Sequence, residues 1–112
     1  MKLSANIKNF RTFRGITQSQ LAETLGKSKN TISNWERGDN FPDPDTIERM
    51  CTIFEVTPNQ IFGWEENPEL ESYLKAQKER EDRLEELRRQ QTELRKEMLK
   101  LEREIAKEKE RP

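Results

Sequence analysis

The stretch Gln18–Arg37, QSQLAETLGKSKNTISNWER, decides the fold of this chain. Apolar residues recur there at helical spacing on both sides of a central glycine. They are Leu21, Ala22 and Leu25 before the glycine, and Ile32 and Trp35 after it. Gly26 takes a positive φ without steric cost, so one helix can stop abruptly and the next can leave at a steep angle. The stretch therefore predicts two short helices joined by a tight turn.

The second of these helices carries an exposed polar face. Ser28 is a good N-cap, because its hydroxyl can bond amide groups that lack a helical acceptor. The side chains that follow it are basic, amide-bearing or hydroxylated: Lys29, Asn30, Thr31, Ser33 and Asn34. Such groups match the base-pair edges in the DNA major groove. The pattern therefore indicates a helix that reads DNA.

Residues within and after this stretch also carry a family resemblance. They are Gln18, Leu21, Ala22, Gly26, Ile32, Trp35, Glu36, Gly38, Phe41 and Pro42, followed by the segments IERMCTIFEV and TPNQIF. Over roughly residues 4–64 the chain resembles the phage repressor and Cro family of helix-turn-helix regulators, also called the Xre family. The resemblance implies an all-α, five-helix lambda-repressor-like headpiece that binds DNA.

By this resemblance, Lys29, Asn30, Thr31 and Asn34 face the base edges. Asparagine can pair with adenine through two hydrogen bonds, lysine donates to guanine, and a threonine methyl packs on thymine. The alternative is that these residues form an ordinary solvated face of a small helical domain.

Phosphate contacts are expected from five further residues. Gln18 and Ser28 lie at helix N-termini, where donors and free amides suit phosphate oxygens. Lys27, Arg37 and Asn40 are additional candidates for phosphate contact.

Arg11 and Glu36 stand where the family commonly has a partly buried salt bridge. The resemblance therefore implies a structural ion pair. Arg11 could equally stay free to bind phosphate, and the sequence leaves both roles open.

Composition supports one small domain plus a solvated part, since 38% of the 112 residues are charged and 30% are hydrophobic. Residues 1–38 hold seven basic and two acidic residues, residues 39–66 one basic and seven acidic, and residues 67–112 thirteen of each. Positive charge is thus concentrated on the segment with the motif, as docking on DNA requires.

Composition also argues against enzymatic chemistry. The chain has no histidine, and its one cysteine, Cys51, lies among apolar residues and is expected in the core. Zinc sites and histidine acid/base chemistry therefore lack their residues, and we expect no enzyme activity, no metal and no cofactor. Without an apolar run that could cross a bilayer or serve as a secretory signal, the chain is expected to be cytoplasmic.

The headpiece is expected to occupy residues 1–66. A first helix should span residues 4–14, and Asp43-Pro44 and Thr57-Pro58 are start signals for a fourth and a fifth helix. The predicted core is formed by Ile16, Leu21, Leu25, Ile32, Trp35, Ile47, Phe54 and Phe62.

Residues 67–112 predict one long helix. With Leu84 at heptad position a, the a and d positions form an apolar seam. Its members are Leu84, Leu87, Gln91, Leu94, Met98, Leu101 and Ile105. Extended backwards, the seam takes in Leu70 and Tyr73, but also Gln77 and Arg80. A coiled-coil homodimer explains this seam better than a lone solvated helix does.

The sequence favours a parallel coiled coil but leaves the orientation open. A parallel pair places Gln91 against Gln91 and suits half-sites about one turn of DNA, ~34 Å, apart. Yet it also sets Arg83 against Arg88 and Glu97 against Glu102.

We therefore expect a sequence-specific transcriptional regulator, of the repressor kind, that binds double-stranded DNA as a homodimer. The alternative is an interaction protein, antitoxin-like or antirepressor-binding, whose C-terminal helix docks on a different partner.

Overall fold

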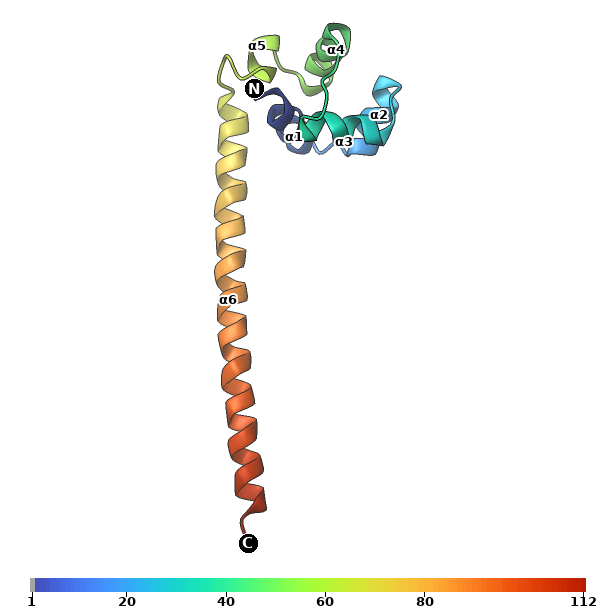
Figure 1. Ribbon diagram of the computed structural model, residues 1–112. Coiled ribbons are helices and arrows are strands. Elements are labelled where there is room, and N and C mark those ends of the chain that lie inside the picture. The colour runs from blue at the N-terminus through green and yellow to red at the C-terminus, as the bar shows by residue number, and fades with distance from the viewer. Residues whose placement is uncertain (1) are drawn as a thin grey trace. The chain divides into compact units, whose positions relative to one another are not determined.

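A computed structural model describes residues 2–112, and Figure 1 shows their arrangement. These residues form helices and no strands. The helices are α1 (Leu3–Phe13), α2 (Gln18–Leu25), α3 (Lys29–Arg37), α4 (Pro44–Phe54), α5 (Pro58–Ile61) and α6 (Pro68–Glu110). The predicted all-α class, with five short helices followed by a long one, is confirmed.

Local signals set the ends of α2. Thr17 Oγ1 accepts a hydrogen bond from the Gln20 backbone N–H at 3.1 Å, and Gln20 Oε1 accepts one from the Thr17 N–H at 2.9 Å. This reciprocal capping box satisfies two donors that the helix itself leaves free. At the other end, Gly26 has φ +68°, so the chain turns sharply and reaches α3 within three residues.

The two ends of α4 differ in strain. Asp43 caps its start by accepting the Thr46 N–H at 2.8 Å, and hydrogen bonding to Thr46 lowers the pKa of the Asp43 carboxyl. Beyond its last residue, Glu55 takes φ +58°, the only positive φ of a non-glycine residue in the described chain. A side chain in this left-handed conformation is strained, and glycine would relieve the strain.

The core of the headpiece gathers side chains from all five short helices. Five predicted core residues are buried: Leu21, Leu25, Ile32, Trp35 and Phe54. The other three, Ile16, Ile47 and Phe62, are only partly buried and pack against this core from its edge.

Seven further apolar residues are buried that were not among the predicted core: Leu3, Ile7, Phe10, Ala22, Met50, Ile61 and Leu70. Cys51 is buried as expected, and its burial raises the pKa of the thiol. At the surface, Phe62 stacks on Trp64 with ring centroids 4.6 Å apart, and Trp64 is 73% exposed.

The first compact unit extends to Leu74, eight residues past the predicted domain boundary. Leu70 is 6% exposed within the core of the headpiece, and the ring of Tyr73 lies 5.2 Å from that of Phe13. The expectation that Leu70 and Tyr73 continue the seam is therefore wrong. Their heptad spacing also places them on one face of a helix, and that face packs on α1 and the core of the headpiece.

The second compact unit, Lys75–Pro112, is the remainder of α6 and the residues after it; we call it the tail. Every residue from Lys78 onward is exposed. Within it, Arg89 pairs with Glu86, and Lys96 Nζ lies 3.4 Å from Glu93 Oε1. Across residues 2–112, no helix is both long and apolar enough to span a membrane.

Candidate nucleic-acid interface

Two buried residues fix α3 in the headpiece. Ile32 is 0% exposed and Trp35 is 5% exposed, and α3 packs against both α1 and α2. Ser28 Oγ accepts the Thr31 N–H at 3.1 Å and caps the start of the helix, while Gly38 ends it with φ +79°. One face of α3 is thus anchored, and its opposite face is free for contact with a partner.

An ion pair lies behind this helix. Arg11 Nε donates to Glu36 Oε2 at 2.7 Å, and Arg11 Nη2 donates to Glu36 Oε1 at 2.8 Å. The side chains of Arg11 and Glu36 are only 10% and 4% exposed. Arg11 Nη1 also donates to the Ile16 carbonyl at 2.8 Å, and Gln18 Nε2 donates to Glu36 Oε1 at 3.2 Å.

This network joins three helices: α1 through Arg11, α2 through Gln18 and α3 through Glu36. Hydrogen bonds to ionised groups are stronger than neutral ones, and two parallel bonds fix the geometry of the pair. The network therefore holds α3 at a set angle against the other two helices. All three nitrogens of the Arg11 guanidinium donate hydrogen bonds within this network. Of the two roles that the sequence left open for Arg11, the side chain adopts that of the ion pair.

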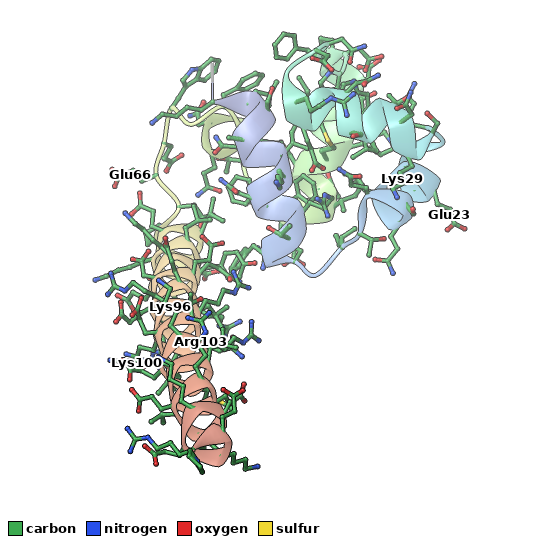
Figure 2. The ribbon with its side chains drawn as sticks, turned by 60° about the horizontal axis from the view of Figure 1, so that its bottom comes forward. Glu23, Lys29, Glu66, Lys96, Lys100 and Arg103 are labelled. Carbon is green, nitrogen blue, oxygen red and sulfur yellow. The ribbon has the colours of Figure 1, made fainter. Side chains whose placement is uncertain are left out.

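The four residues expected to face base edges all lie on α3. Lys29 and Asn30 are exposed, and Thr31 and Asn34 are half-buried. Figure 2 shows Lys29 extending from the start of the helix. The hydroxyls of Thr31 and Ser28 are 2.9 Å apart, and Asn34 Oδ1 accepts a hydrogen bond from Arg37.

The five residues expected to contact phosphates differ in their freedom. Lys27, Ser28 and Asn40 are exposed. The Gln18 side chain instead turns inward to Glu36.

Arg37, the fifth, is held by neighbours at the end of α3. Its Nε donates to Asp39 Oδ2 at 3.0 Å, and its Nη1 donates to Ser33 Oγ at 2.7 Å. Arg37 must release Asp39 before it can pair fully with a phosphate.

The structure also adds backbone groups that the sequence reasoning missed. The capping box satisfies the N–H groups of Thr17 and Gln20, so those of Gln18 and Ser19, in the first turn of α2, have no helical acceptor. A shallow depression at this helix end is lined by Arg11, Thr12, Gly15, Ile16, Thr17, Gln18, Ser19 and Lys29. The Thr17-x-x-Gln20 spacing is a capping-box signal that could have revealed these donors.

Comparisons with known proteins agree with this architecture. A family model described as Helix-turn-helix matches residues 7–61. The HTH-type transcriptional activator BcrR of Enterococcus faecalis is 33% identical over 66 residues, which cover 59% of this chain and 32% of that protein. The competence pilus inhibition repressor of Acinetobacter baylyi is 34% identical over 74 residues, which cover 66% of this chain and 67% of that protein.

A solved structure, that of the clp gene regulator ClgR from Corynebacterium glutamicum, is similar in fold. It aligns with a TM-score of 0.51 at 23% identity, covering 74% of this chain and 83% of that one. The chain spans only about a third of the length of the activator. These relatives are named as regulators of transcription or as repressors. The chain belongs to the Xre-type helix-turn-helix transcriptional regulators.

Proposed function

We propose that this protein is a sequence-specific DNA-binding transcriptional regulator whose α3 enters the major groove. One observation carries the proposal: α3 presents polar side chains, with Lys29 and Asn30 exposed, while Ile32 and Trp35 are buried and a buried network holds the helix against α1 and α2. Rigid presentation matters because ordering flexible side chains on binding costs affinity.

Base reading is assigned to Lys29, Asn30, Thr31 and Asn34. Lys29 and Asn30 follow the N-cap directly, and the early residues of a recognition helix are those that reach base edges. Their ammonium and amide groups offer the donors and acceptors that the major groove distinguishes.

Phosphate binding is assigned to the N-termini of α2 and α3 and to nearby side chains. Gln18 and Ser19, whose backbone N–H groups have no helical acceptor, line a depression that Lys29 also lines. Because the Gln18 side chain donates to Glu36, we assign the phosphate contact of Gln18 to its backbone N–H. Lys27, Ser28 and Asn40 are exposed beside this region, and Arg37 joins them once it leaves Asp39.

The test of base reading compares two asparagines of the full chain. A preferred duplex is first selected from a random pool. Asn34→Ala should then cost about 1–3 kcal/mol on that duplex and much less on random DNA. Asn59→Ala, an exposed amide on α5, is the matched control and should bind normally. Equal losses on both DNAs would remove Asn34 from base reading, and no selectable duplex would end the proposal.

The second part of the proposal is a homodimer formed through the tail. The apolar seam residues are between 44% and 66% exposed in the single chain: Leu84, Leu87, Leu94, Met98, Leu101 and Ile105. An aligned apolar stripe of this length is costly in water, and a coiled coil buries it. Two linked headpieces also bind DNA more tightly, because the second contact becomes intramolecular.

Leu99 offers a matched control for this interface. It is 53% exposed, close to the 55% of Leu101, but lies at heptad position b, off the seam. Leu101→Ser should lower the dimer fraction in sedimentation equilibrium, whereas Leu99→Ser should leave it unchanged. A wild-type chain that is monomeric would instead favour a heterologous partner for the tail, as in an antitoxin-like or antirepressor-binding protein.

Repression is the proposed mode of regulation. A headpiece bound at a promoter excludes other proteins by occupancy alone, so no further contact is required. Transcription from the selected duplex, measured with and without the protein, tests whether the protein represses or activates. Higher transcription in its presence would indicate an activator.

A further inference from the structure

Charges beside the seam are segregated along the tail. Heptad positions e and g flank the apolar stripe. In the first half the charged residues at these positions are basic: Arg83, Arg88 and Arg95. In the second half, as far as residue 104, they are acidic: Glu97, Glu102 and Glu104. The basic Lys109 follows at the next e position. The seam thus has a positive half and a negative half, divided near its middle.

These six flanking charges are unengaged within the chain. All six are exposed, and none forms an ion pair among residues 2–112. The ion pairs of the seam segment, Glu86 with Arg89 and Glu93 with Lys96, join c and f positions on the opposite face of α6. Figure 2 shows Lys96, Lys100 and Arg103, also at c and f positions, projecting from the helix.

In a parallel pair of tails, the flanking charges oppose each other. Position g meets position e five residues further along the partner, so Arg83 meets Arg88 and Glu97 meets Glu102. Each clash occurs twice by symmetry. Only Glu104 with Lys109 is favourable.

An antiparallel pair sets the positive half of each tail against the negative half of the other. Aligned on the apolar layers, Arg83 lies within reach of Glu104 of the partner subunit, and Arg88 within reach of Glu102 of the partner subunit. Long-range attraction then acts between the opposite halves of the two tails. Like-charge contacts lie nearer the middle: Arg88 is also within reach of Arg95 of the partner subunit, and the two copies of Arg95 face each other.

The apolar layers also fit this orientation. Leu84 packs on Leu101 of the partner subunit and Leu87 on Met98 of the partner subunit, with Gln91 beside Leu94 of the partner subunit. The two Gln91 side chains then occupy neighbouring layers about 4.5 Å apart along the axis. Their amides can still bond each other, so antiparallel pairing keeps the polar contact that favoured a parallel one.

We infer that the tail binds a second copy of this chain in antiparallel orientation, an inference that rests on the proposed homodimer. In this register the two Leu74 residues lie about 55 Å apart along the coiled coil, at 1.5 Å per residue.

Reversal of one charge separates the two orientations. Arg83→Glu places like charges together in the antiparallel pair but removes a clash from the parallel one. We expect the dissociation constant of the dimer to rise about tenfold at low salt, since each surface pair is worth up to about 1 kcal/mol. Adding Glu104→Arg should restore it. A tighter Arg83→Glu dimer would overturn the inference.

Disulfide trapping gives an independent reading, in a Cys51→Ala background that lacks the native thiol. Mixed L84C and L101C chains should cross-link to each other under mild oxidation, and neither variant should cross-link to itself. Self-cross-linking of either one would establish parallel pairing and overturn the inference. A monomeric chain would overturn it as well, while base reading by Asn34 would still be judged by its own binding assay.

Discussion

The headpiece and the tail use apolar residues in opposite ways. In the headpiece, the large apolar side chains of α1 to α5 close on one another, and eight of the largest are less than 2% exposed. In the tail, every apolar seam residue is at least 44% exposed. The headpiece therefore completes its core within one chain, whereas the tail repeats a pattern that only a second helix can bury. The stability of the headpiece should therefore depend on contacts within one chain, and that of the tail on contacts between two chains.

The largest effect on stability is expected from removing the buried ion pair of the headpiece. Glu36→Ala strands the charge of Arg11, so the free energy of unfolding should fall by about 3–5 kcal/mol in urea denaturation. Glu23→Ala, at an exposed site on α2, should change it by less than about 0.5 kcal/mol. The double variant Arg11→Met, Glu36→Leu should recover most of the loss. An unchanged midpoint in Glu36→Ala would show that the pair is dispensable.

The next effect sharpens the border between the two regions. Leu70→Ala empties a site in the core of the headpiece, so its unfolding free energy should drop by about 2–3 kcal/mol. Leu101→Ala removes the same side chain from an exposed position and should change the dimer but not the unfolding of the headpiece. Hydrogen exchange of core amides checks both. Equal protection in wild type and Leu70→Ala would move the border back toward residue 66.

A smaller effect should stabilise the headpiece. Glu55→Gly relieves the left-handed backbone at the end of α4, and we expect a gain of about 0.5–1 kcal/mol in thermal denaturation. The lost contact with Arg14 offsets little of this gain, because the two side chains are 3.9 Å apart and that of Glu55 is 78% exposed. Glu48→Gly, inside the same helix, is the control and should destabilise. Destabilisation by both substitutions would mean that the strain at Glu55 is absent.

The smallest effect depends on pH. Hydrogen bonding to Thr46 lowers the pKa of Asp43 in the folded state, so its carboxylate stabilises the fold above the unfolded pKa of about 3.9. That contribution disappears as the pH falls through the lowered folded value. Asn caps a helix about as well as Asp, so Asp43→Asn should match the wild type at pH 7 and lose less stability below about pH 4. Parallel acid-unfolding curves would exclude this cap as a source of acid sensitivity.

Most of the fold could be predicted because its signals are local. Gly26, Asp43-Pro44 and Thr57-Pro58 mark helix ends through the conformation of a few neighbouring residues. Leu70 shows where such signals fail: heptad spacing places it on one face of a helix but does not say which neighbour covers that face. Leu70 packs in the core of the headpiece, and this packing depends on contacts between residues that are far apart in sequence.

For the candidate site, the sequence supplied candidate residues but not the conformations of their side chains. Gln18 and Arg37 were expected to reach phosphates, yet one bonds Glu36 and the other bonds Asp39. Long polar side chains have several partners within reach, and residue type alone cannot rank them. The Arg11–Glu36 contact differs, because both side chains are largely buried and Arg11 also donates to the Ile16 carbonyl.

The placement of aromatic residues gives the two regions separate spectroscopic signatures. All eight phenylalanine, tryptophan and tyrosine residues lie within the first 73 positions, so near-ultraviolet absorption and emission report on the headpiece alone. Trp35, 5% exposed, should resist quenching by iodide, whereas Trp64, 73% exposed, should not. The tail contributes only to the far-ultraviolet helical signal, so one titration can follow each half of the molecule without a label.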